Sequence, residues 1–220
     1  MRLIAAGVAV ALCTAACGQP PAPAPTSTPV TTTAPDGPVN PARIDRVRQE
    51  LPDGYEVTSI DTRTSPIALW GFGPDWQAEP EPCATLAAAA VDPATARGWS
   101  ASGAGGIVYA VVARTTAPPD PALAGQCGQW TLSGGHATAI VTGLAAPTID
   151  GAQTAGMAAA IDTVVEGGTE TRSHADTFTA DLGAYHCFVT VVTDPGSPNA
   201  ALGADFAAGL LVKTVSALRG

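Results

Sequence analysis

The sequence predicts an α+β fold, in which a twisted antiparallel sheet of hairpins carries helices packed on one face. Two glycine pairs, Gly134-Gly135 and Gly167-Gly168, lie between β-prone runs. Such pairs are a strong hairpin signal, because a two-residue turn needs residues that tolerate positive φ. Hairpins outnumber predicted helices, and the strand–helix–strand alternation of parallel sheets does not dominate. The C-terminal segment is patterned as an amphipathic helix that would close the core.

In the first half of the folded part, the clearest element is a helix that begins after Asn40 and ends at Pro52. Asn40 is a favourable N-cap, and Pro41 is favourable at the first helical position. Ile44 and Val47 would lie on its buried face. The other predicted elements, in chain order, are a strand over 55–63, a short Ala-rich helix over 82–90, and strands over 99–102 and 107–114.

The second half is predicted to be a meander followed by the long helix. The predicted strands cover 130–133, 136–142, 154–166, 169–180 and 185–193. Ser197 is the expected N-cap of the final helix, with Pro198 at its first position. Asp205 and Lys213 would lie on its polar side. The predicted apolar face comprises Leu202, Phe206, Leu210, Leu211, Val215 and Leu218.

Residues 1–16 are typical of a secretory signal peptide, with a positive start at Arg2, an apolar run over 3–12 and small residues before Cys17. The apolar run is too short to span a membrane, which takes about 20 residues. A Cys directly after small residues resembles a bacterial lipobox. The resemblance implies that the Cys17 thiol receives a diacylglycerol before cleavage. Ordinary secretion through a general signal peptidase is the alternative.

Residues 17–41 are predicted to be a lipidated, Pro/Thr-rich tether, and residues 42–220 a single globular domain. Positions 18–41 hold eight prolines and six Ser or Thr, a composition that cannot bury a core. The whole chain has a formal charge of −9. That charge argues against nucleic-acid binding through phosphate contacts and against attraction to an anionic bilayer. We therefore expect the acyl chains to hold the protein on the extracytoplasmic side of the cell membrane.

Three cysteines remain in the folded part, namely Cys83, Cys127 and Cys187. An oxidising compartment favours one disulfide, which leaves one thiol over or paired between molecules. Cys187 lies in an apolar strand run, where a Cys behaves as a small hydrophobic residue. Cys83 and Cys127 lie at a helix start and in a loop, so we expect the disulfide to be Cys83–Cys127.

The catalytic motifs that the chain approaches are incomplete, so we expect no enzymatic activity. Ser102 occupies the place of the second glycine in a nucleophile elbow around Ser100. Leu210 stands where a Ser/Lys pair would need a serine before Lys213. His186 and Cys187 are adjacent on a predicted strand, so they point to opposite faces and cannot pair.

His174 and Asp176 share one face of a predicted strand and could hold zinc if a neighbouring strand supplied a third ligand. The sequence shows no His-x-x-x-His spacing in support, and an exposed polar face is the better interpretation. We therefore expect no metal and no cofactor.

The segment over 70–76 places three large aromatic residues among residues that favour irregular backbone. Trp70, Phe72 and Trp76 are predicted to line an apolar ligand cleft, since aromatic residues on a loop often do so. The alternative is that they fold back and cap the core.

Three segments carry a family resemblance: Leu-Pro-Asp-Gly-Tyr at 51–55, Cys-Gly-Gln-Trp at 127–130, and Val-Thr-Asp-Pro-Gly-Ser at 192–197, which leads into the Ala-Leu-Arg-Gly end. The span 40–220 resembles a family of uncharacterised actinobacterial, mainly mycobacterial, lipoproteins, itself similar to the extracellular sensor domain of the mycobacterial serine/threonine kinase PknH. The resemblance implies a sheet with helices on one side and a cleft for an unidentified ligand. The kinase-type domains usually have two disulfides, of which only one can carry over here.

Two functions follow as expectations. The first is a binding or sensor-like lipoprotein that presents a cleft to a small envelope molecule. The second is a structural or interaction lipoprotein that contacts another envelope protein without a small ligand. A deep apolar cleft with buried polar groups would favour the first, and a flat exposed apolar patch would favour the second.

Replacing Cys17 with Ala tests the anchor. We expect the variant to leave the membrane fraction, because the thiol that would carry the acyl chains is gone. Cell fractionation followed by detergent extraction measures this. A variant that stays with the membrane as firmly as the wild type contradicts the lipoprotein assignment.

Overall fold

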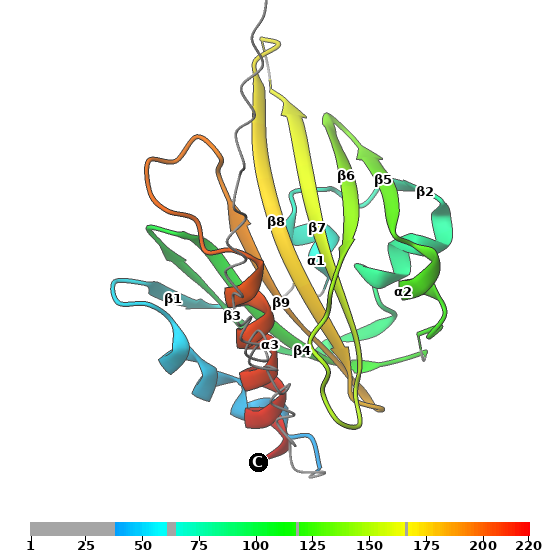
Figure 1. The fold of residues 1–220 in the computed structure, drawn as a ribbon, viewed down its shortest axis with the longest axis vertical. Coiled ribbons are helices and arrows are strands. Elements are labelled where there is room, and N and C mark those ends of the chain that lie inside the picture. Colours follow the sequence, from blue (N-terminus) through cyan, green and yellow to red (C-terminus); the bar gives the residue numbers. More distant parts are fainter. Residues whose placement is uncertain (1–37, 61–64, 118, 166) are drawn as a thin grey trace, which may run out of the picture. The chain divides into compact units, whose positions relative to one another are not determined.

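The computed structural model describes residues 38–60, 65–117, 119–165 and 167–220 (Figure 1). The predicted signal peptide, Cys17 and most of the predicted tether lie outside the described residues. Within those ranges, the helices are too short or too polar to cross a membrane.

In the described residues, nine strands form one sheet with antiparallel pairing throughout, in the order β1-β3-β4-β9-β8-β7-β6-β5-β2. The α+β class and the antiparallel sheet are therefore confirmed. Most neighbours in the sheet are also neighbours in the sequence, but β4 pairs with β9 and joins the first part of the chain to the meander. The strands are β1 (Glu56–Ser59), β2 (Gln77–Glu79), β3 (Val91–Gly103), β4 (Gly106–Thr115), β5 (Gln129–Gly134), β6 (Ala137–Leu144), β7 (Gln153–Val164), β8 (Glu170–Asp181) and β9 (Tyr185–Thr193).

Both predicted glycine turns are present. Gly167 and Gly168 have φ of 90° and 79°, in the left-handed region that favours glycine. In the other turn, Gly135 has φ of 58°, whereas Gly134 pairs with Ala137 at the end of the β5–β6 ladder. The two-residue turn is therefore Gly135-His136, one residue later than the glycine pair.

Five helical segments of the described part of the chain cover the sheet. Asn40 caps the first of them as predicted, its Oδ1 accepting a hydrogen bond from the Ala42 N–H at 3.1 Å. Two of them are 3₁₀ helices, namely the first and the short segment in the region predicted as an Ala-rich helix. The helical segments are η1 (Pro41–Glu50), α1 (Pro66–Leu69), η2 (Glu81–Leu86), α2 (Leu123–Gln126) and α3 (Ala204–Arg219).

The long helix α3 begins after Gly203, several residues later than the predicted start at Ser197-Pro198. The Leu202 N–H donates to the Gly105 carbonyl at 2.9 Å, which fastens the preceding segment to the β3–β4 turn. The Ser197 Oγ accepts instead from the Asn199 N–H at 3.2 Å. A tertiary contact thus prevails over the local capping signal.

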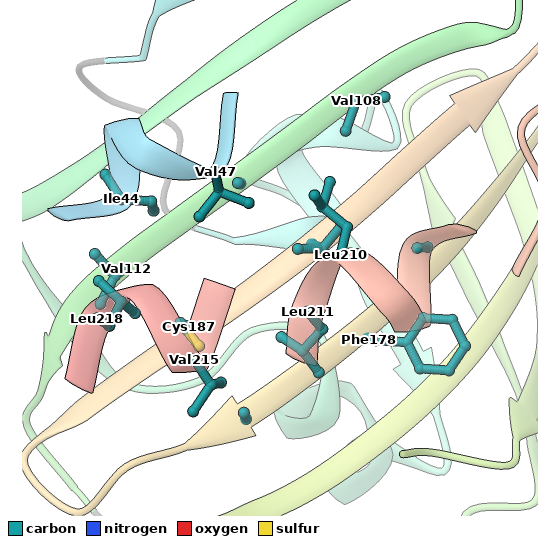
Figure 2. Packing of buried hydrophobic residues seen from close by; sticks show 14 of the residues in the cluster. Ile44, Val47, Val108, Val112, Phe178, Cys187, Leu210, Leu211, Val215 and Leu218 are labelled. Atoms are coloured by element: carbon teal, nitrogen blue, oxygen red, sulfur yellow. The ribbon is translucent and has the colours of Figure 1, made fainter. Parts of the chain in front are cut away.

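One face of the sheet is covered by α3 and η1, as Figure 2 shows. The indole N–H of Trp99 on β3 donates to the Ile44 carbonyl of η1 at 3.1 Å. The Asn40 N–H donates to the Leu218 carbonyl of α3 at 2.8 Å, which ties the two helices together. The central residues of this cluster are Ile44, Val47, Val108, Val112, Phe178, Cys187, Leu210, Leu211, Val215 and Leu218.

The opposite face is covered by α1, η2 and α2, so helices lie on both faces where the sequence predicted one. On β9, Val189 packs in the α3 cluster, while its neighbour Phe188 packs with Leu69 of α1. Strands buried on both faces appear in a sequence as continuous apolar runs. The runs 107–113 and 187–192 have that form, and they are the signal that the second face is covered too.

The short helices of the second face are joined covalently, because Cys83 of η2 forms a disulfide with Cys127, which follows α2. This is the predicted pairing. Cys187 is a free, buried cysteine on the other face. Burial, with a smaller contribution from the charge of Asp181, raises the pKa of the Cys187 thiol to about 12.

Truncating Leu211 to Ala tests the α3 interface. Leu211 is 0% exposed, so we expect the free energy of unfolding to fall by about 2–5 kcal/mol, from lost apolar burial and a residual cavity. The matched control is Ile140→Ala, because Ile140 is 52% exposed and should change stability by less than about 0.5 kcal/mol. Chemical denaturation measures both, and equal losses would contradict the packing described here.

Peptide mapping without reductant tests the disulfide. We expect one cross-linked peptide pair containing Cys83 and Cys127, and no alkylation of Cys187 in the folded protein near neutral pH, since its pKa is raised to about 12. Removal of the bridge by Cys83→Ser should cost about 4 kcal/mol in the chain-entropy account of a loop of this length. A cross-linked peptide that contains Cys187 would overturn this assignment.

Candidate functional site

The aromatic residues predicted to line a ligand cleft lie against the core. Trp70 and Phe72 are 4% and 5% exposed and belong to the apolar cluster of the second face, against which Trp76 is partly buried. The Trp70 indole N–H donates to the Thr177 Oγ1 at 3.2 Å. These contacts are those of core residues, so Trp70 and Phe72 do not form the predicted cleft wall. Burial of three large rings outweighs the irregular backbone around them.

Two adjoining cavities lie elsewhere on the second face, between the disulfide-linked helices and the sheet. Their volumes are about 200 and about 20 Å³. Four residues line both cavities, namely Leu86, Ala124, Thr154 and Ala155. We call the two cavities together the roofed cleft, with η2 and α2 as its roof and β7 as a common wall.

The side chains that line the larger cavity are mainly apolar. Its wall includes Leu86 of η2, Trp130 of β5 and Met157 of β7, and the disulfide-bonded Cys127 lies at its edge. Trp130 and Met157 are almost fully buried, at 2% and 1% exposure. The disulfide holds the roof helices at a fixed separation, so this cavity is part of a covalently constrained structure.

The smaller cavity ends at a buried histidine–carboxylate pair. Asp181 on β8 and His186 on β9 face each other across the ladder, and Asp181 Oδ1 lies 2.7 Å from His186 Nδ1. Their side chains are 16% and 5% exposed. The other ring nitrogen, Nε2 of His186, is buried and has no hydrogen-bond partner among the described residues.

His186 and Cys187 lie on opposite faces of the sheet, which confirms the prediction that they cannot pair. The partner of His186 that the sequence did not predict is Asp181. A tight β8–β9 turn over 182–184 separates the two residues, and the hairpin register brings them opposite each other. The signal available in the sequence was therefore a carboxylate and a histidine at either end of a short turn.

A larger, more open groove of about 470 Å³ lies at the β3–β4 turn and the β9–α3 loop. Its polar groups include Thr193, Asp194 and Asn199. The glycines of the turn have a packing role, because a Cβ at Gly106 would lie 2.5 Å from the Val192 carbonyl oxygen. Although this groove is larger, it is half open and lacks a buried titratable group, so the roofed cleft is the better candidate site.

His174 and Asp176 do share a face, with the His174 Nε2 3.1 Å from the Asp176 Oδ1. This hydrogen bond raises the pKa of His174, an effect that partial burial opposes. Because the pKa is raised, the pair stabilises the fold below the unfolded-state pKa of about 6.5, and the contribution disappears as pH rises through the folded-state pKa. In the part of the chain that the structure describes, no three His, Cys, Asp or Glu residues group as metal ligands.

Comparisons with other proteins agree with this fold. A solved X-ray structure of an uncharacterized Mycobacterium smegmatis protein, described as an Rv0999 ortholog, superposes with a TM-score of 0.62 at 22% identity. The match covers 86% of this chain and 100% of that one, and at this identity it shows a shared fold. Curated proteins yield no match. A family model described as "Domain of unknown function (DUF5642)" matches residues 40–219, so the chain belongs to the DUF5642 family.

Proposed function

We propose that this protein is a membrane-anchored, extracytoplasmic lipoprotein whose domain is a non-enzymatic binding or sensor-like module for a small envelope ligand. The lipobox-like Cys17 and the Pro/Thr-rich tether support the anchor. The sequence resemblance to an extracellular kinase sensor domain supports the sensor-like role.

The observation that carries this proposal is the roofed cleft. Ligand sites are typically concave and mainly apolar, with a few buried polar groups that fix orientation. The roofed cleft combines an apolar chamber with one buried His186–Asp181 pair. Its larger chamber, about 200 Å³, is below the range of about 300–1,000 Å³ usual for drug-sized ligands, so the ligand is small or only part of it enters.

A binding role also agrees with the state of the nucleophilic side chains in and near the roofed cleft. Cys127, the cysteine at the cleft, is held in the disulfide, and Cys187 lies on the other face of the sheet. The hydroxyl of Thr154 donates to the Pro147 carbonyl at 2.8 Å. Thr85 and Thr179 also line the chamber beside His186, but Nε2 of His186 makes no hydrogen bond to either hydroxyl. Among the described residues, the pair therefore lacks the nucleophile–base contact that acyl transfer needs.

A second candidate function rests on the first face of the sheet. Beyond the reach of α3, strands β5 to β7 expose Thr131, Thr138, Ile140 and Ala160. Ile140 is 52% exposed. These four residues line a shallow hollow of about 320 Å³ on the exposed sheet face. An exposed sheet face of this kind suits contact with another envelope protein, which is the interaction alternative.

Native mass spectrometry of the full lipoprotein, purified from an actinobacterial host, tests the proposed function. We expect a molecule of defined mass to copurify with the wild type. Ala155→Leu should abolish copurification, because Ala155 lines both chambers and a larger side chain fills them.

Ala160→Leu is the matched control, since Ala160 lies on the same strand but is exposed on the opposite face. It should keep the small molecule. Melting temperatures identify any variant that is merely unfolded. A wild type without a bound molecule, or equal retention by folded Ala155→Leu, contradicts the proposal. Loss of a partner protein in Ala160→Leu alone would favour the interaction alternative.

A further inference from the structure

Three buried side-chain atoms in the described part of the domain have no hydrogen-bond partner, namely Arg48 Nε, Thr115 Oγ1 and His186 Nε2. Of these three, His186 is the one whose residue lines the roofed cleft. Asp181 occupies the other ring nitrogen at 2.7 Å. A carboxylate can only accept hydrogen bonds, so the proton lies on Nδ1, and Nε2 of the neutral ring carries a lone pair. A buried acceptor without a donor costs free energy that a bound hydroxyl would recover.

We propose that the roofed cleft binds a neutral, apolar molecule bearing one hydroxyl group, whose O–H donates to Nε2 of His186. This inference rests on the proposed function and names its ligand class. The hydroxyl lies in the small chamber against His186, and the apolar body lies in the larger chamber.

The sizes of the two chambers match this division. A water-sized group needs about 10–15 Å³ of cavity volume, and the chamber at His186 has about 20 Å³. The chamber next to it has about 200 Å³ and is walled by Leu86, Trp130 and Met157. Because Leu86 lines both chambers, the chambers adjoin, and the proposal places one short molecule across the two.

The charge of the lining excludes an acidic ligand. The charged residues that line the two chambers are Asp120 and Asp181, and neither chamber is lined by Lys or Arg. The polar residues that line the chamber with His186 are Asp181 and Thr179 from β8, Gln153 and Thr154 from β7, Asp120 from the segment before α2, and Thr85 from η2. Even with the ring protonated, Asp181 would offset its charge, so a carboxylate or phosphate would find net repulsion.

An ammonium group is also disfavoured. It would have to shed its strong hydration to enter a chamber of about 20 Å³, which costs more than the desolvation of a hydroxyl. One oxygen of each carboxylate is already engaged, because Asp120 Oδ1 accepts from the Ala122 N–H at 2.9 Å and Asp181 Oδ1 lies 2.7 Å from His186 Nδ1. A hydroxyl is the donor with the smallest desolvation cost for this position.

The experiment compares four probes with the same six-carbon chain length on the full lipoprotein in lipid nanodiscs, with empty nanodiscs as the blank. The probes are 1-hexanol, 2-hexanone, hexanoate and hexylammonium, and equilibrium dialysis measures their binding. We expect 1-hexanol to bind about tenfold more tightly than 2-hexanone, which accepts but cannot donate; a tenfold ratio is what one net hydrogen bond supplies.

His186→Phe should remove the preference for 1-hexanol while 2-hexanone still binds. The matched control is His174→Phe, which changes a partly exposed histidine on the other face of the sheet and should keep the preference. If His186→Phe does not fold, ¹⁵N NMR of the wild type tests the hydrogen bond to Nε2 instead. The Nε2 resonance of His186 should move upfield with 1-hexanol and stay in place with 2-hexanone.

The outcomes separate the two levels of the proposal. If none of the four probes binds the wild type, the roofed cleft is not a ligand site, and the proposed function fails. If probes bind but 2-hexanone, hexanoate or hexylammonium binds as well as 1-hexanol, the ligand class is wrong while the cleft stands. A preference for 1-hexanol that survives in folded His186→Phe also overturns the role of His186.

Discussion

The burial of β4 and β9 on both faces is the constraint on which the rest of the domain depends. These two strands pair with each other in the middle of the sheet and join its early and late parts. Their side chains alternate between two apolar clusters, with Val189 in one and Phe188 in the other. Each face therefore needs a cover, because an open face would leave large apolar side chains in water.

The two covers differ in kind, and this difference creates the candidate site. On one face, α3 is a single long helix that packs a continuous apolar stripe against the strands. On the other face, α1, η2 and α2 are each short, and a helix of one or two turns has little stability by itself. The Cys83–Cys127 disulfide links two of these segments. A cover made of short pieces leaves cavities at its joints, and the roofed cleft is where η2 and α2 meet the sheet.

The position of His186 turns one of those cavities from a packing defect into a candidate site. A purely apolar cavity would hold a ligand in any orientation that fits. The Asp181–His186 pair can fix the orientation of the ligand through a hydrogen bond. The pair lies on the two strands that flank a tight turn, so the backbone register orients the ring before any ligand arrives. Pre-orientation of this kind lowers the entropic cost of binding.

Local patterns predicted several elements well. Asn40-Pro41 marks the start of η1, the glycine pairs mark hairpins, and the apolar stripe of α3 has the spacing that the helix uses. These features depend on backbone conformation and short-range periodicity, which neighbouring residues decide. The Cys83–Cys127 pairing also followed from the environment of each cysteine along the chain.

Tertiary structure decided what depends on residues far apart in the sequence. The contact of Leu202 with Gly105 delays the start of α3, and the burial of Trp70 and Phe72 moves them from the predicted cleft into the core. The roofed cleft draws its lining from η2, α2 and β5 to β9, so no single segment could reveal it. The sequence by itself determined the α+β class, the hairpins and the signal-peptide-like pattern of the N-terminal segment. Each of these depends on residues that are close together in the chain. Where the cavity lies, and that His186 lines it beside Asp181, were settled only when distant segments packed together.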